Sequence, residues 1–175
     1  PEWKDAVVCT ISDASFGNES EIIKGEKEGD RSQQGYIIVL APPDILNAET
    51  AVVHPIVCSS TTIKRVCRAT LVAEAFSLTN GTESGARIRA AIVDARGELD
   101  YKNWEVSASE SMSHVWLTDC DSLYEHLISP SAKQVANKRL AIDLKALRQS
   151  VWERAGERTD VVDSTSGDYP RWIDT

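Results

Sequence analysis

This 175-residue sequence lacks long apolar runs, and it also lacks the cysteine and histidine spacings that are typical of zinc-binding proteins. No stretch approaches the roughly eighteen consecutive apolar residues of a membrane-spanning helix, so we expect no contact with a membrane. The four cysteines never form a CxxC pair, and no histidine lies near them in a zinc-like spacing. They are therefore expected to be small buried thiols in a reducing compartment.

Basic residues are also scarce, because 19 Lys and Arg stand against 27 Asp and Glu, which gives a net charge of −8. This balance excludes a strongly basic nucleic-acid scaffold. Only residues 61–100 have a small positive excess, with six basic and five acidic side chains. A chain of this charge either avoids polyanions or contacts them locally, through a few cations and a bound metal.

The sequence starts with Pro-Glu-Trp-Lys-Asp, which has neither an initiator Met nor a basic segment followed by an apolar one. We therefore expect a processed piece of a longer chain that is not secreted and is located in the cytoplasm or the nucleus. The length of 175 residues, with 42% apolar side chains, suits one folded domain that spans residues 1–175.

Three strands are predicted in the first third of the chain. Residues 6–13 alternate with period two and include several β-branched side chains, and residues 35–41 form a short apolar run. Residues 50–59 form the third strand, in which Pro55 indicates an edge position or a bulge. The polar stretch 17–33 between the first two strands is predicted to be an exposed loop.

Helices and strands alternate in the rest of the predicted order. A long helix is expected from residue 64 to about residue 96, capped by the hydroxyls of residues 59–62, with Gly81 and Gly85 as possible breaks or kinks. The elements after it are a strand at 114–119, a short helix at 121–128, an amphipathic helix from residue 137 to about residue 154 and a last strand near 169–173. This order predicts the α/β class, with helices packed on a mixed sheet.

Three acids stand at positions where a carboxylate is unexpected. Asp13 and Asp119 each close a predicted strand in phase with its apolar side chains, and Glu74 lies in the most apolar part of the long helix. Taken singly, each has an ordinary explanation, because Asp often begins a turn or caps a helix and a helical face can be solvated. If the three converge, their oxygens are ligands of the kind that Mg²⁺ prefers.

The segments around these acids resemble the ribonuclease H domain of copia-type LTR-retrotransposon polyproteins. The resemblance extends from about Val7 to Thr175 and includes the acids in the order Asp, Glu, Asp, whereas transposon integrases share the fold but place Glu last. The segments that carry it are Ser12–Ser15, Val53–Ile56, Arg65–Ala75, Leu117–Leu123 and Lys138–Leu144.

The resemblance implies a ribonuclease H-like fold with a five-stranded mixed sheet flanked by helices. It implies a hydrolase, an endonuclease that cleaves the RNA strand of RNA–DNA hybrids with two Mg²⁺ or Mn²⁺ ions. Asp13, Glu74 and Asp119 become the catalytic, metal-binding carboxylates, and Asp121 becomes a helix cap. The implied partners are the hybrid, the reverse transcriptase and the other parts of the same polyprotein, or other proteins if the copy is domesticated.

One acid of the family has no counterpart here. The family has a fourth acid near the start of a final helix, after a segment rich in Trp and Ile or Val. This chain ends at Tyr169–Thr175, just before that position, and Asp174 does not match it. We therefore expect a domain without its final helix. The alternative function is a non-catalytic ribonuclease H-like module that acts as a protein-interaction or structural subunit.

A second group of residues is predicted to bind nucleic acid. Its three cations lie at the predicted start of the long helix, a few residues after two serines. Hydroxyls and cations at a helix N-terminus can hold a phosphate, although an ordinary solvated helix start explains the same pattern. The six candidates are Ser15, Ser59, Ser60, Lys64, Arg65 and Arg68.

Overall fold

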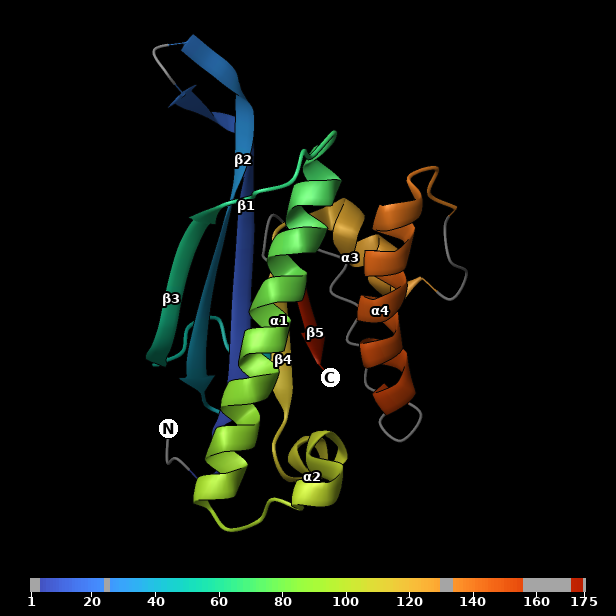
Figure 1. Ribbon diagram of the computed structural model, residues 1–175. Coiled ribbons are helices and arrows are strands. Elements are labelled where there is room, and N and C mark those ends of the chain that lie inside the picture. Colours follow the sequence, from blue (N-terminus) through green and yellow to red (C-terminus); the bar gives the residue numbers. More distant parts are fainter. Residues whose placement is uncertain (1–3, 24–25, 130–133, 156–170, 175) are drawn as a thin grey trace.

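The computed structural model describes residues 4–23, 26–129, 134–155 and 171–174. Its strands are β1 (Val7–Ile23), β2 (Glu26–Ala41), β3 (His54–Thr62), β4 (His114–Thr118) and β5 (Arg171–Asp174). Its helices are α1 (Thr70–Ala95), α2 (Trp104–Ser111), α3 (Asp121–Ile128) and α4 (Lys138–Ala155), with the short 3-10 helices η1 (Ile45–Asn47) and η2 (Tyr101–Asn103). The predicted class, helices on a mixed α/β sheet, is confirmed (Figure 1).

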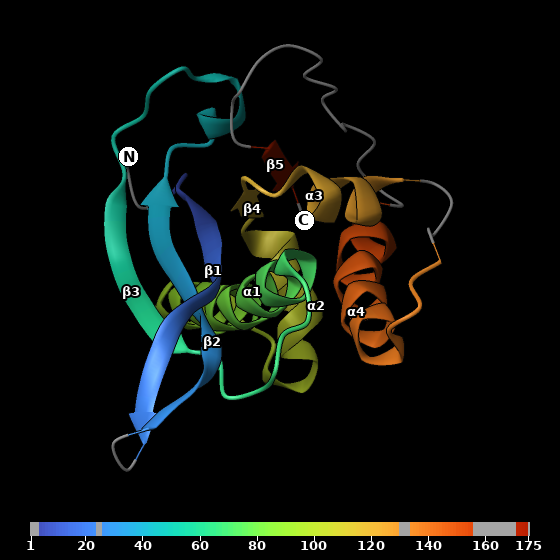
Figure 2. The same cartoon turned by 90° about the horizontal axis from the view of Figure 1, so that it is seen from above.

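The sheet has the strand order β3-β2-β1-β4-β5. The first three strands form an antiparallel meander, whereas β4 lies beside β1 in the parallel direction because α1 and α2 carry the chain back along the sheet. The short β5 pairs antiparallel with β4 at the far edge. Figures 1 and 2 show α1 and α2 against one face of the sheet, with α4 beside α1 and η1 on the other side of the sheet. The parallel pair β1 and β4 is therefore covered from both sides.

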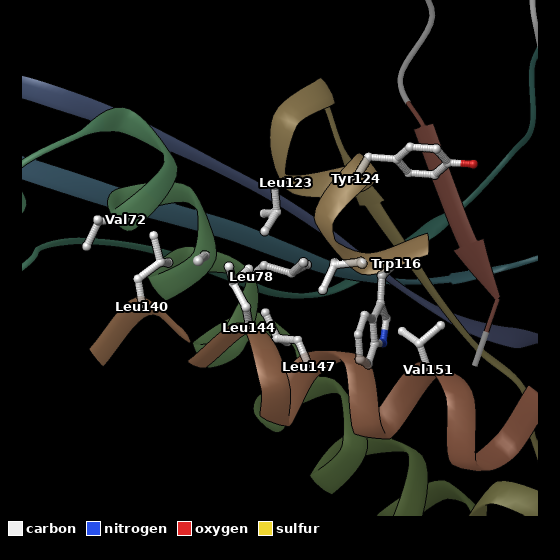
Figure 3. Close-up of a cluster of buried hydrophobic side chains, with 11 residues drawn as sticks. Val72, Leu78, Trp116, Leu123, Tyr124, Leu140, Leu144, Leu147 and Val151 are labelled. Carbon is white, nitrogen blue, oxygen red and sulfur yellow. The ribbon is translucent and has the colours of Figure 1, made fainter. Parts of the chain in front are cut away.

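The largest group of buried apolar side chains joins α1, α3 and α4 to Trp116 of β4 (Figure 3). The predicted apolar stripe of the amphipathic helix supplies four of its members: Leu140, Leu144, Leu147 and Val151. Burying a side chain of this size contributes about 1.5–3 kcal/mol, so this cluster fixes α4 against α1 and α3. Among the described residues, no helix combines the length and the apolarity that crossing a membrane requires.

The prediction of a loop at residues 17–33 was wrong, because β1 and β2 continue through most of it as a long hairpin. Figure 1 shows this ribbon extending past the helices. Strand pairing uses backbone groups only, so a ribbon that does not cover a core has no need of alternating apolar side chains. Two register shifts, at residues 15–19 and 20–22, interrupt the ladder, and Gly17 has the positive φ of 66° that a bulge can require.

The prediction for Pro55 is confirmed, because β3 is an edge strand and its pairing with β2 shifts register at this residue. Val39 pairs with Pro55, whereas Ile38 pairs with Val57, so one residue of β3 is left over. Proline cannot donate a ladder hydrogen bond, which is why it is found at such positions.

The predicted start of the long helix was wrong by six residues. The helix begins at Thr70, and its N-cap is Ala69, which makes no side-chain capping bond. The serines and threonines of residues 59–62 belong to β3 and do not cap the helix. Strand pairing continues one residue further, because the N–H of Ile63 donates to the carbonyl of Ser32 at 2.8 Å. Residues 63–69 lie between β3 and α1 and form a loop, in which Lys and Arg are not helical although they favour helices.

Gly81 and Gly85 do not break α1, which runs unbroken for 26 residues. They lie where the helix meets the sheet. A Cβ on Gly81 would stand 2.9 Å from Cγ2 of Thr10, and a Cβ on Gly85 would stand 2.6 Å from its Oγ1 and would also contact the His114 ring. Thr10 and His114 are buried and hydrogen-bonded to each other at 2.8 Å. The two glycines thus allow α1 to lie directly on β1 and β4.

We expect Gly85→Ala to lower the free energy of unfolding by about 1–3 kcal/mol, because overpacking outweighs the better helix propensity of alanine. Urea unfolding followed by circular dichroism measures this. Gly97→Ala is the control, since a Cβ there meets nothing within 4 Å and only its φ of 74° is unfavourable. A Gly85→Ala protein as stable as the wild type would contradict the close approach of α1.

Candidate metal centre

The candidate centre lies where β1 and β4 stop pairing. Their parallel ladder runs from Val8 and His114 to Ser12 and Thr118. The next residue on each strand is an acid, Asp13 on β1 and Asp119 directly after β4. Parallel strands end at the same edge of a sheet, so the two carboxylates reach the same place from segments that are far apart in the sequence.

Glu74 comes to this place from the helix that covers the strands. It lies in the second turn of α1, with only 4% of its surface exposed. Its carboxylate accepts a hydrogen bond from the backbone N–H of Ala14. Ala14 lies beyond the last pair of β1 and β4, so its N–H is not needed by the parallel ladder. The divergence of the strands thus creates the donor that orients Glu74.

The three carboxylates form one cluster, in which each offers an oxygen and these oxygens all lie within 4.8 Å of one another. Asp13 and Asp119 are exposed and Glu74 is buried. The Oε2 atom of Glu74 is buried without a hydrogen-bond partner in the described part of the chain. An unsatisfied buried carboxylate oxygen is costly, and a bound cation is one group that would satisfy it.

Burial and the neighbouring acids raise the pKa of Glu74 from its ordinary value of 4.5 to about 7. Burial is the largest cause, followed by the negative charges of Asp119 and Asp13, and the Ala14 hydrogen bond opposes both. A cation among the carboxylates would reverse the effect of the neighbouring charges, because it favours the ionised form of all three.

Ser77 holds the helix at the level of this cluster, one turn after Glu74. Its buried hydroxyl lies 2.9 Å from the carbonyl oxygen of Asp13 and 2.9 Å from that of Gly35, and it donates its one proton to this pair. The contact joins α1 to both β1 and β2. Sequence reasoning missed it, because a single serine in an apolar helix carries no sign of its partners.

The cluster fits a hard divalent cation. Its ligand atoms are all carboxylate oxygens, which Mg²⁺ prefers, and one of them lacks any other partner in the described residues. Asp13, Glu74 and Asp119 are the residues that would hold such an ion, with two exposed carboxylates and one buried carboxylate around it.

The resemblance implied that Asp121 caps the next helix, but Asp121 is not its N-cap. It is the first residue of α3, and the N-cap is Cys120, which makes no side-chain capping bond. An acid in the first turn still stabilises the helix through its dipole.

The predicted nucleic-acid candidates are spread over β1, β3 and the loop before α1. Ser15 is half-buried on β1, two residues after Asp13, and Ser59 is half-buried on β3. Ser60 accepts a hydrogen bond from Gln33 at 2.7 Å. Lys64 and Arg68 are exposed in the loop, whereas Arg65 is bound to other parts of the protein. None of the six lies at a helix N-terminus, so that part of the prediction was wrong.

We expect the buried Glu74 to make stability depend on pH. Between pH 4.5 and 7 the folded state holds a proton that the unfolded chain has lost, so the free energy of unfolding falls as the pH rises through this range. A shift of this size corresponds to a cost on the order of 3 kcal/mol at pH 8. Glu74→Gln should remove it and stabilise the protein by about 1–3 kcal/mol at pH 8 in EDTA, but not at pH 4.5.

Urea unfolding at both pH values measures this difference. The matched control is Glu83→Gln, an exposed position on the same helix, for which we expect no pH-dependent gain. Equal stabilities of the wild type and Glu74→Gln at pH 8 would show that the carboxylate is not buried among charges.

Comparisons of this chain with known protein families, with curated proteins and with solved structures find no match. Inference about function therefore depends on the cluster itself and on the sequence motifs that carry its three acids.

Proposed function

We propose that this chain is a ribonuclease H-like, metal-dependent nuclease domain that hydrolyses the RNA strand of RNA–DNA hybrids. The observation that carries the proposal is the convergence of Asp13, Glu74 and Asp119 from β1, α1 and the end of β4 within 4.8 Å. Spacing alone gave these acids little weight, since they are separated by 61 and 45 positions in the sequence. Their convergence in the order Asp, Glu, Asp supports the resemblance to the retrotransposon domain.

The chemistry of the cluster favours phosphoryl transfer over other uses of carboxylates. The acids without a cation would repel a phosphodiester, because the ionised carboxylates and the phosphate both carry negative charge. Divalent cations held there would activate a water molecule and stabilise the leaving oxygen, which is the chemistry that two such ions supply in nucleases. The proposed cofactors are therefore two Mg²⁺ or Mn²⁺ ions.

The residues of the chain divide this work according to their exposure. The buried Glu74, held by Ala14, provides the fixed ligand around which a cation is placed. Asp13 and Asp119 are exposed, so they leave one side of the site open to a substrate phosphate. Since Glu74 has a pKa of about 7, loading of the site should strengthen as the pH rises through neutrality.

The arrangement of the sheet is in line with this proposal. A mixed sheet with helices packed on it, and with two acids at the ends of neighbouring parallel strands, is the architecture that the resemblance implies. The partners that belong to the proposal are an RNA–DNA hybrid and the other parts of a retroelement polyprotein, including its reverse transcriptase.

We expect the purified protein to cleave the labelled RNA strand of an RNA–DNA hybrid when Mg²⁺ or Mn²⁺ is added, and to leave the DNA strand intact. Glu74→Gln and Asp119→Asn should each lower the cleavage rate at least about 100-fold, because each removes charge that holds the cations. Gel electrophoresis of the hybrid measures the rate, and Glu83→Gln serves again as the control that should cleave normally.

A thermal shift in Mn²⁺ separates the two parts of the proposal. A cation that binds only the folded state raises Tm in the wild type, and the rise should be lost in Glu74→Gln. A rise without cleavage would leave a metal-binding module and overturn the nuclease. If Tm does not rise and no cleavage is observed, the metal centre is overturned as well.

A further inference from the structure

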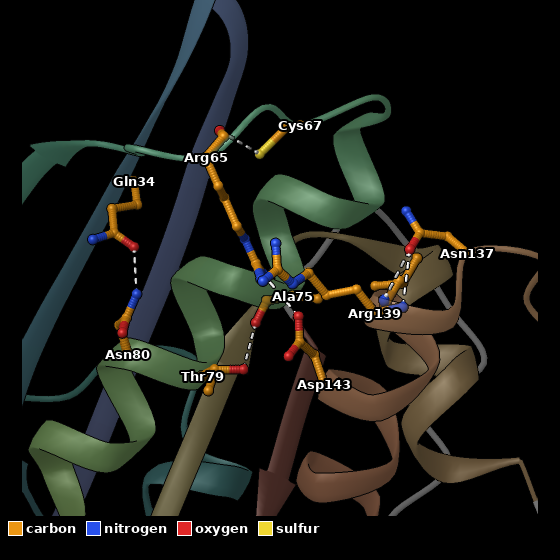
Figure 4. A network of polar contacts seen from close by, with 10 residues as sticks. Gln34, Arg65, Cys67, Ala75, Thr79, Asn80, Asn137, Arg139 and Asp143 are labelled. Atoms are coloured by element: carbon orange, nitrogen blue, oxygen red, sulfur yellow. Dashed lines mark hydrogen bonds and ion pairs between the residues drawn. The ribbon is translucent and has the colours of Figure 1, made fainter.

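Two stretches far apart in the sequence bring cations together on one side of this acidic protein. One is the loop of residues 63–69 between β3 and α1, and the other is the first turn of α4. Arg65 of the loop is hydrogen-bonded to Asp143 of the helix, which lies one turn after Arg139 (Figure 4). Four cations of these stretches are exposed, and we call them the cationic patch: Lys64, Arg68, Lys138 and Arg139.

Arg65 joins the two stretches and is itself occupied. Its Nη2 atom donates to Oδ2 of Asp143 on α4 at 2.8 Å. The centre of its guanidinium lies 4.0 Å from the centroid of the Phe76 ring on α1. With a side chain only 20% exposed, Arg65 fixes the loop to both helices. Asp143 is the only acid in the loop and the first two turns of α4, and Arg65 neutralises it.

The loop also packs directly beside the metal centre. Ile63 and Cys67 contact a small apolar cluster that includes Phe76, Ala14 and Ala73. Ala14 follows Asp13 in the sequence, and Ala73 precedes Glu74. The cationic patch is therefore attached to the backbone that carries two of the three acids, at the same end of α1.

The position of Lys138 and Arg139 works against folding. They are the first two residues of α4. The Oδ1 atom of Asn137 caps this helix by accepting hydrogen bonds from the backbone N–H groups of Arg139 and Leu140, at 3.1 and 3.2 Å. Cations at the positive end of a helix dipole are unfavourable, and this first turn contains no acid to offset them. Within the described residues, neither cation makes an ion pair. Such a cluster, on a chain of net charge −8, is expected where a polyanion binds.

We propose that Lys64, Arg68, Lys138 and Arg139 bind the phosphate backbone of a nucleic acid, and that Arg65 is the positioning residue that keeps the two stretches together. The identity of the polyanion rests on the proposed function. The patch adds α4 to the predicted interface and changes the role of Arg65 from a phosphate ligand to a support. Contacts of this kind carry affinity and orientation but do not distinguish base sequences.

The test is the affinity for a fluorescent RNA–DNA hybrid, measured by anisotropy in EDTA over a range of salt concentrations. Lys138→Gln/Arg139→Gln should bind about tenfold more weakly, and the slope of log K against log[salt] should fall by about 1.8, since each lost contact accounts for about 0.9. The same variant should melt about 1–2 °C higher, because the helix dipole then loses two unfavourable charges.

Lys4→Gln/Lys102→Gln is the matched control, with the same change of net charge. Lys4 precedes β1 and Lys102 lies in η2, so neither belongs to the two stretches of the patch. The control should keep the wild-type affinity and slope. An unchanged affinity and slope in Lys138→Gln/Arg139→Gln would overturn the patch. Poly-glutamate that competes as well as single-stranded DNA would overturn the nucleic acid as its partner.

Failure of the patch is distinguishable from failure of the nuclease. Glu74→Gln should bind the hybrid in EDTA at least as tightly as the wild type, because it loses negative charge and keeps the patch. Salt-dependent binding that needs Lys138 and Arg139, in a protein that never cleaves, would support the patch and overturn the nuclease. Cleavage that is lost in Glu74→Gln, but is unchanged when the four cations of the patch are replaced, would support the nuclease and overturn the patch.

Discussion

The candidate metal centre depends on one buried carboxylate and on the place where two strands part. Glu74 is ionisable and only 4% exposed. It accepts a hydrogen bond from the backbone N–H of Ala14, which is available because β4 has already ended. Asp13 and Asp119 follow from the same divergence. A single feature of the sheet therefore provides the donor, the space and two of the three acids. The helix adds the third, and Ser77 keeps the helix in position through the carbonyl groups of Asp13 and Gly35.

Charged side chains lower the stability of the folded protein in two places, at Glu74 and at the start of α4. Burial among like charges holds the pKa of Glu74 near 7, so its ionised form opposes folding when no cation is present. Lys138 and Arg139 oppose folding at the start of α4 for a different reason, the direction of the helix dipole. Both costs have the same natural remedy, which is a ligand of opposite charge. In the proposed function, the acids would bind cations and the bases would bind the phosphates of the same substrate.

Local patterns predicted much of this fold. Period two identified the paired cores of β1 and β4, Pro55 identified the edge strand, and the apolar stripe of α4 is buried as expected. The predicted loop at residues 17–33 and the helix start at residue 64 were wrong, because backbone pairing of the hairpin and of Ile63 overrides side-chain preferences. The convergence of the three acids was predicted from the resemblance and is present, whereas their catalytic role stays a prediction.

What the sequence did not reveal are contacts between distant residues. Arg65 and Asp143 are 78 positions apart, and Ser77 is 64 positions from Asp13. Each of these residues also suits an exposed surface, so no local pattern singles it out. The same holds for the cationic patch, since two cations in a loop and two at the start of a helix are unremarkable until the loop and the helix lie together.

Gly81 and Gly85 fix the position of α1 along the sheet, because only a residue without a side chain fits at each of these two contacts. A rigid helix transmits position along its axis, and Gly85 is eleven residues, or about 16 Å, from Glu74. If the helix slid by one residue, larger side chains would meet Thr10 and His114, whose bond leaves no room for them. The depth at which the carboxylate stands between the strands is thus fixed from the middle of the helix, by the absence of side chains at Gly81 and Gly85.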